Sequence, residues 1–164
     1  MEYLLENEFL QAVVASQGAE LASVREKATG RELMWRGDAA VWGRHAPILF
    51  PYCGRLRGGA FTHRGVRYEG GQHGFARDME HALVEKGEAH VSLCLKANVL
   101  TMEKFPFAFR LSSTYTLQGT SVVHRVQVEN QSGEVMPFSL GYHPGFACPF
   151  DAAHGTQDYV LRFD

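Results

Sequence analysis

Alternation of apolar and polar side chains is the property of this chain that most limits its possible folds. Between positions 107 and 117 one set of alternate residues is Phe107, Phe109, Leu111, Ser113, Tyr115 and Leu117. Residues 91–96 repeat the pattern, with Val91, Leu93 and Leu95 on one face. A period of two places successive side chains on opposite faces of a β-strand, so both segments predict half-buried strands rather than helices.

Turn residues divide the rest of the chain into further short strands. Gln118-Gly119-Thr120 predicts a turn between residues 107–117 and a returning strand at 122–129. Three more hairpins are predicted around glycine-containing turns, joining residues 21–26 to 31–35, 61–63 to 66–68, and 81–84 to 89–95. One helical turn is expected at 99–104, before Pro106, and residues 159–164 alternate like the start of a strand. Strands at this spacing predict an all-β fold, an antiparallel sandwich or a barrel.

Length and charge narrow the class of protein. With 164 residues, 45% of them hydrophobic, the chain can bury one core, so we expect residues 1–164 to form a single domain. A net charge of −2 without a long Lys or Arg run argues against a nucleic-acid-binding protein. Cys53, Cys94 and Cys148 form no CxxC pair, the first residues are acidic, and no apolar run approaches roughly 18 residues. We therefore expect a cytoplasmic protein with no membrane or nucleic-acid partner, and the oligomeric state stays open.

Two histidine segments interrupt the strand pattern. Residues 72–78 read Gln-His-Gly-Phe-Ala-Arg-Asp, and residues 141–146 read Gly-Tyr-His-Pro-Gly-Phe. Irregular loops on a β framework are where binding residues concentrate. Histidine has the side-chain pKa nearest neutrality, so two histidines above a neutral substrate can donate and accept protons without a metal or cofactor. We predict that the two segments form two walls of one pocket.

Each histidine also has a structural alternative. His143 lies among glycines and a proline, and we interpret it as a proton donor, the alternative being a residue that only holds its loop. His73 is also flanked by glycines, and either a turn or a functional role fits its position. Phe75 follows it and offers an apolar plate beside it.

Two arginines and an aspartate are further candidates. Arg55 ends an apolar run, where its guanidinium suits sugar hydroxyls or a phosphate, the alternative being a solvated loop arginine. Arg77 and Asp78 follow the first histidine, and the alternative for them is a surface ion pair with each other. The other histidines lack metal-ligand spacing and no nucleotide-binding motif is present, so we expect no metal and no cofactor. Trp35 and Trp42 are interpreted as packing residues rather than sugar-stacking ones.

Three segments together resemble the aldose 1-epimerase (galactose mutarotase-like) superfamily, most closely its LacX-like branch. They are residues 46–51 leading to Gly54-Arg55, residues 72–78 and residues 141–146. The resemblance implies a large antiparallel β-sandwich that interconverts the α and β anomers of a free aldohexose. It implies that His143 is the general acid and that His73 and Arg55 bind and polarise sugar oxygens. The supporting or substrate-binding residues implied beside them are Phe75, Arg77, Asp78 and Tyr142.

The chain departs from this family in one respect. The resemblance implies a general-base glutamate and a sugar-binding aspartate in the C-terminal part of the protein, whereas Asp164 comes 18 residues after Phe146. We therefore expect a sandwich that is incomplete at its C-terminus and holds the acid without the base, with Glu129 and Glu134 solvated rather than substituting for it. The alternatives are a non-catalytic carbohydrate-binding module and a hexose-6-phosphate 1-epimerase, the latter suggested by Arg55, Arg57, Arg64 and Arg67.

Overall fold

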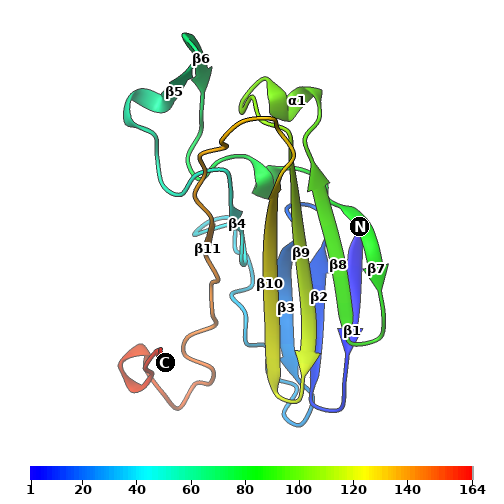
Figure 1. The fold of residues 1–164 in the computed structure, drawn as a ribbon. Coiled ribbons are helices and arrows are strands. Elements are labelled where there is room, and N and C mark those ends of the chain that lie inside the picture. The colour runs from blue at the N-terminus through cyan, green and yellow to red at the C-terminus, as the bar shows by residue number, and fades with distance from the viewer. Residues whose placement is uncertain (164) are drawn as a thin grey trace.

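Two antiparallel sheets face each other in the computed structural model, which describes residues 1–163 (Figure 1). The first sheet has the order β1-β2-β3, formed by β1 (Glu2–Glu6), β2 (Leu10–Ala15) and β3 (Glu20–Glu26). The second has the order β10-β9-β8-β7, formed by β7 (Ala82–Lys86), β8 (His90–Lys96), β9 (Phe109–Gln118) and β10 (Ser121–Asn130). The expected all-β antiparallel sandwich is thereby confirmed.

The core lies between the two sheets and follows from the alternation in the sequence. Along β9 the residues from Phe109 to Leu117 are buried at every second position, as the period of two predicts. Leu111 and Tyr115 are fully buried, and Leu5 and Val14 of the other sheet are buried with them. Full burial of one such side chain stabilises a fold by roughly 1.5–3 kcal/mol, so the alternation itself favours the sandwich.

Most of the predicted hairpins are present. The pairs β9–β10 and β7–β8 form as expected, and so does the pair of β5 (Ala60–His63) with β6 (Val66–Glu69). The expected helical turn is α1 (Val99–Met102), whose first turn is capped by the side chain of Asn98. Residues 31–35, in contrast, join β3 by a single bridge, Arg25 to Glu32. The Glu32 carboxylate accepts hydrogen bonds from the Val24 and Met34 amides, which replaces part of a regular ladder.

The strand predicted at residues 159–164 is wrong over the described residues 159–163, which have no strand structure. Tyr159 instead packs edge-on to the ring of Phe150 with centroids 5.2 Å apart, and Val160 and Phe163 are 91% and 87% exposed. Alternation makes a strand only where a neighbouring strand supplies hydrogen bonds, and these residues have none beside them in the described part of the chain. Residue 164 lies outside the described residues.

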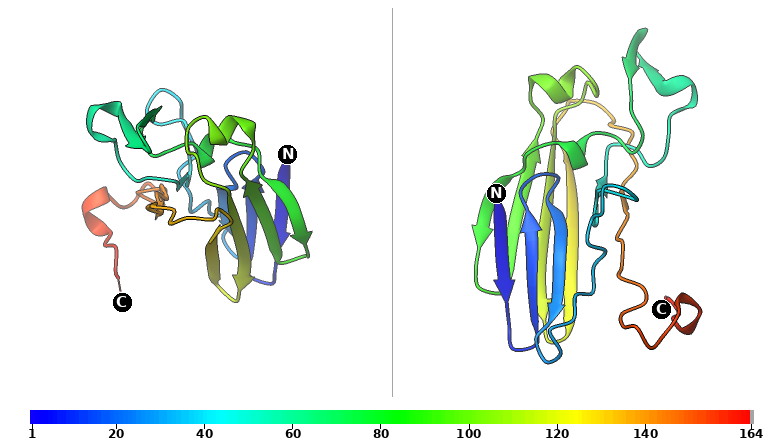
Figure 2. Two further views of the ribbon diagram at one scale, coloured as in Figure 1. Left: turned by 45° about the horizontal axis from the view of Figure 1, so that its top comes forward. Right: turned by 180° about the vertical axis from the view of Figure 1, so that it is seen from behind.

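Short elements complete the fold and position the histidine segments. Strand β4 (Ile48–Leu49) pairs with β11 (Gly141–Tyr142) beside the sandwich, and three 3₁₀ turns lie at η1 (Arg57–Gly59), η2 (Ala76–Asp78) and η3 (Thr156–Asp158). The β5–β6 hairpin projects from the sandwich, and the C-terminal segment lies outside it in every view (Figures 1 and 2). No helix among residues 1–163 is long and apolar enough to cross a membrane.

Candidate active site

The β4–β11 pair fixes the position of the second histidine segment. Its ladder places Gly141 opposite Leu49. The backbone N–H of His143 then donates to Pro47 O at 3.1 Å, and that of Gly145 donates to the carbonyl oxygen of His45 at 2.7 Å. The segment that carries His143 is therefore bound along its length to residues 45–49.

The first histidine segment is attached to the same stretch of backbone. The carbonyl oxygen of Phe50 accepts from the Phe75 amide at 3.0 Å and from the Ala76 amide at 3.2 Å. Gly74 has φ +73°, and a Cβ added there would lie 2.1 Å from the oxygen of Phe50. Only glycine fits this approach, which explains why the motif has glycine directly after His73.

The two histidines meet as a consequence. The ring centroids of His73 and His143 lie 6.2 Å apart, with the planes at 60°. The segments reach this position from opposite sides of residues 47–50, one through Pro47 and the other through Phe50. The structure thus brings together the two residues that the sequence analysis singled out.

The backbone of Gly54 holds His73 in one orientation. The Gly54 amide donates to Nδ1 of His73 at 2.9 Å, and the His73 amide donates to Gly54 O at 2.7 Å. Because Nδ1 accepts, the proton of the neutral ring lies on Nε2, which is 3.1 Å from the side-chain amide of Gln72 and can donate to that amide only through its oxygen. Burial, followed by the charges of Arg77 and His143, lowers the pKa of His73. The ring is therefore a neutral Nε2–H donor near pH 7.

His73 also has an unusual backbone conformation. Its φ is +66°, in the left-handed region that side chains other than glycine rarely adopt. Such a conformation costs on the order of 1–3 kcal/mol and persists where the surroundings enforce it, often at functional sites. Here the two hydrogen bonds to Gly54 enforce it.

Trp42 packs beside His143. The two rings have centroids 5.1 Å apart at an angle of 39°. Trp42 is held in turn by its carbonyl oxygen, which accepts from Nε1 of Trp35 at 2.8 Å, and a Cβ added to Gly145 would lie 2.7 Å from the Trp42 ring. Trp42 was expected only to pack, and its contact with His143 was not predicted, although it precedes residues 46–51 by only a few positions.

Asp78 has a different main partner from the one expected. Its Oδ1 lies 2.5 Å from Nη2 of Arg44, whereas its Oδ2 lies 3.8 Å from Nε of Arg77. Arg77 instead donates to the carbonyl oxygen of Gln72 at 2.7 Å, and burial, followed by the charge of Arg44, lowers its pKa. Arg44 thereby joins residues 42–47 to the first histidine segment, which no pattern in the sequence indicated.

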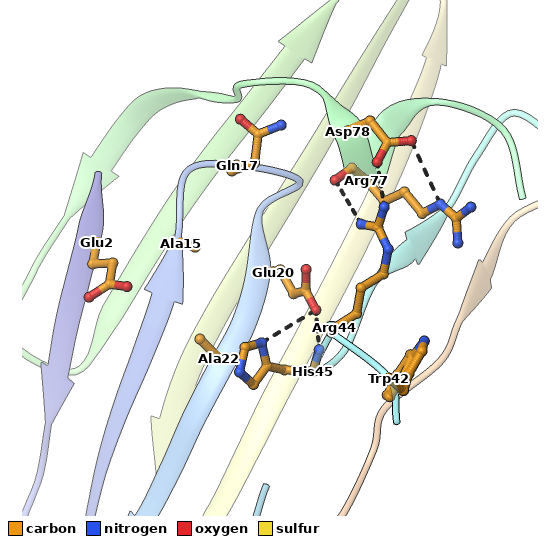
Figure 3. A pocket seen from close by; sticks show the side chains of 11 residues that line it. Glu2, Ala15, Gln17, Glu20, Ala22, Trp42, Arg44, His45, Arg77 and Asp78 are labelled. Atoms are coloured by element: carbon orange, nitrogen blue, oxygen red, sulfur yellow. Dashed lines mark hydrogen bonds and ion pairs between the residues drawn. The ribbon is translucent and has the colours of Figure 1, made fainter. Parts of the chain in front are cut away.

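A cavity of about 540 Å³ lies between β3, residues 42–45 and residues 77–78 (Figure 3). Glu20, Arg44 and Asp78 line it, and so do Trp42 and Arg77, which also contact the histidine segments. His73 and His143 themselves are not part of its wall. The cavity is therefore a charged recess next to the histidines rather than the space between them.

The side chains of three other predicted site residues form no hydrogen bond or ring contact with His73 or His143 within residues 1–163. Phe75 is 4% exposed and packs in the core against Phe50, so it does not form a plate that faces a ligand. The ring of Tyr142 lies 4.7 Å from that of His124, and burial raises the pKa of Tyr142 to about 12. Arg55 is exposed and forms no hydrogen bond or ion pair within residues 1–163.

Two of the three other arginines of this cluster, Arg64 and Arg67, have carboxylate partners, which disfavours a phosphate site. On the β5–β6 hairpin, Arg64 lies 3.0 Å from Glu134, and Arg67 lies 2.8 Å from Glu69. Glu134 also lies 3.4 Å from His63, so this carboxylate, expected to be solvated, is 31% exposed and also ion-paired. It is ion-paired because the segment after β10 passes beside the hairpin (Figure 1). Among residues 1–163, no group of three or more His, Cys, Asp or Glu residues is arranged to hold a metal ion.

Comparison with known proteins agrees with this arrangement. Protein LacX encoded on a plasmid of Lactococcus lactis subsp. lactis is 35% identical over 165 residues, covering 97% of this chain and 55% of that protein. A galactose mutarotase related enzyme from Lactobacillus acidophilus superposes with a TM-score of 0.94 at 37% identity, covering 96% of this chain and 53% of that one. A galactose mutarotase-like protein from Lactobacillus casei ATCC 334 gives a TM-score of 0.88 at 37% identity, with coverages of 93% and 52%.

The match extends over the described chain. This chain spans about half the length of the relatives it matches. The sequence model described as aldose 1-epimerase matches residues 1–163, which include both histidine segments. With the shared fold and the paired histidines, this shows that the chain belongs to the aldose 1-epimerase family.

Proposed function

We propose that this chain takes part in the interconversion of the α and β anomers of an aldohexose, with His143 as the general acid. The observation that supports this best is the pair of imidazole rings of His73 and His143, whose centroids lie 6.2 Å apart. The ring oxygen and the C1 hydroxyl of a sugar are bonded to the same carbon, so two groups at this separation can reach both.

In the proposed chemistry His143 acts as an acid and His73 as a hydrogen-bond donor. The imidazolium of His143 donates its proton to the ring oxygen as the bond between that oxygen and C1 breaks, while the C1 hydroxyl loses its proton to a base. The product is the open-chain aldehyde, and rotation about C1–C2 followed by reclosure inverts the anomeric centre. His73 donates its Nε2–H to a sugar oxygen that takes the place of the Gln72 side-chain amide, and the exposed guanidinium of Arg55 donates to a second sugar oxygen.

We assign the general base to none of the carboxylates among residues 1–163. Within residues 1–163, neither His73 nor His143 forms an ion pair with a carboxylate. Glu129 accepts from the Gln127 side chain on β10, and Glu134 is paired with Arg64. We therefore propose that solvent accepts the C1 proton when this chain acts alone, which limits the rate.

Exchange between the anomers of glucose and galactose, followed by NMR on the chain of 164 residues, tests the proposal. A positioned acid contributes a factor of about 10²–10⁴, so we expect acceleration of about that size at most. His143→Ala is expected to reduce the rate to that of buffer. The matched control is His154→Ala, which removes an exposed histidine that pairs with Asp151 on the C-terminal segment.

The outcomes separate the possibilities. Rapid turnover that disappears in His143→Ala would mean that a base is already present, which contradicts acid-only catalysis. Saturable sugar binding without faster exchange would identify a carbohydrate-binding module. Equal rates for the wild type, His143→Ala and buffer, without binding, would overturn the proposal altogether.

A further inference from the structure

Glu20 is a buried carboxylate that the mechanism above does not use. The residue begins β3, is 9% exposed and lies at the wall of the charged cavity (Figure 3). Its Oε1 accepts the backbone N–H of His45 and also that of Ala46, the latter at 2.8 Å. A buried carboxylate that accepts hydrogen bonds from two backbone amides is held in one position, and it holds those two amides in position as well.

The amides held by Glu20 belong to the segment on which the His143 loop rests. The carbonyl oxygen of His45 accepts a hydrogen bond from the Gly145 amide. Two residues further on, the carbonyl oxygen of Pro47 accepts one from the His143 amide. Trp42, just before these residues, packs on the imidazole of His143. Contacts from residues 42–47 therefore reach both the backbone and the ring of the proposed acid.

We propose that Glu20 is a positioning residue for His143: its carboxylate oxygen holds the His45 and Ala46 amides and thereby seats Trp42 against the imidazole. This inference rests on the proposed function for its catalytic consequence only. The geometric part, the contact between Trp42 and His143, is measurable without any sugar.

Two conservative substitutions of Glu20 separate the effect of side-chain length from the effect of charge. Glu20→Gln keeps an acceptor oxygen at the same distance from the backbone and loses the charge. Glu20→Asp keeps the charge and shortens the side chain by one methylene, which withdraws the oxygen from both amides. Positioning predicts that the Gln variant behaves like the wild type and that the Asp variant is impaired. An electrostatic role toward His45, whose Nδ1 lies 3.7 Å from Glu20, or toward Arg77 predicts the reverse.

Asn7 provides a matched control for stability. Its Oδ1 also accepts two successive backbone amides, those of Phe9 at 2.9 Å and Leu10 at 2.8 Å, in the β1–β2 turn. Asn7→Ala removes the same type of interaction, and with it the hydrogen bond from Nδ2 to Gly119 O, at a place that does not contact residues 42–47 or the His143 loop. A loss of global stability alone would therefore affect Asn7→Ala and Glu20→Asp alike.

The readout is the NOE between the indole protons of Trp42 and the ring protons of His143, with His143 assigned from the spectrum of His143→Gln. We expect the NOE in the wild type, Glu20→Gln and Asn7→Ala, and its loss in Glu20→Asp. Anomer exchange is expected to fall about tenfold in Glu20→Asp and to stay within about twofold in Glu20→Gln, because small displacements of a catalytic group are costly. Loss of the NOE in Glu20→Gln, or its retention in Glu20→Asp, would overturn the inference. An inactive wild type with the expected NOE pattern would refute the proposed function and leave the positioning role standing.

Discussion

Gly54 and His73 hold each other by a reciprocal pair of hydrogen bonds: the Gly54 amide donates to Nδ1 of His73, and the His73 amide donates to Gly54 O. The distances are 2.9 Å and 2.7 Å. One ring nitrogen is thereby bonded to the backbone, and the other lies 3.1 Å from the side-chain amide of Gln72. This relationship determines the tautomer of His73.

His73 should titrate below the ordinary histidine value of 6.5, with Nε2 protonated in the neutral form. The main cause of the lowered pKa is burial, and the charge of Arg77 is the next. Arg77→Met is therefore expected to raise the midpoint toward 6.5, whereas Arg67→Met, on the β5–β6 hairpin, should leave it unchanged. Long-range ¹H–¹⁵N NMR gives the tautomer and the midpoint together. A protonated Nδ1 in the neutral ring would contradict the assignment.

Gly74→Ala should destabilise the protein by more than about 2 kcal/mol, because it combines a left-handed backbone with a steric clash. The added methyl group would lie 2.1 Å from the oxygen of Phe50, which is backbone and cannot rotate away. Gly71→Ala is the control, since a Cβ there meets nothing within 4 Å. Urea unfolding measures both variants, and equal stabilities would show that the Phe50 contact is looser than described.

His124 should make the protein sensitive to acid. Burial lowers its pKa to about 4 from 6.5, and its ring stacks on Tyr115 with centroids 4.0 Å apart. The unfolded chain then binds the proton more tightly than the folded one, so the stabilisation present above pH 6.5 is lost as the pH falls toward 4. At 1.36 kcal/mol per pKa unit the loss is about 3 kcal/mol. His124→Gln should flatten the curve of unfolding free energy against pH over this range, and parallel curves would refute the assignment.

The ion pair of Arg44 with Asp78 should contribute little stability despite its short distance of 2.5 Å. The two side chains are 29% and 53% exposed, so water screens the attraction. A double-mutant cycle with Arg44→Ala and Asp78→Ala is expected to give a coupling of about 0.5–1 kcal/mol that shrinks in 1 M salt. The more exposed pair Arg67–Glu69 should give less. A coupling above about 2 kcal/mol would mean that this pair is desolvated.

The predictable features of this fold are local ones. The alternation from Phe109 to Leu117 reports directly which side chains face the other sheet, and the structure buries them as expected. Alternation at Tyr159 predicted a strand wrongly, because a strand also needs a neighbour that the sequence does not reveal. The same limit applies to Glu20, which meets the His45 amide from 25 residues away.

For the candidate site, the sequence indicated the two histidines because each lies in a segment of unusual composition. It did not indicate Trp42 or Arg44, whose neighbours come from distant parts of the chain. Phe75 was named for its place beside His73, but in a turn adjacent side chains point in different directions, and this one enters the core.

The β5–β6 hairpin lies between Arg55 and His73 in the sequence and projects away from the sandwich (Figures 1 and 2). Gly54 and His73 are bonded to each other at its base, so the loop between them is closed by the protein itself. Lengthening a closed loop costs little free energy, roughly 0.6 kcal/mol for each doubling. Evolution and protein engineering can therefore insert residues here, or graft a recognition element or a fluorescent label, close to the histidine pair and without rebuilding it.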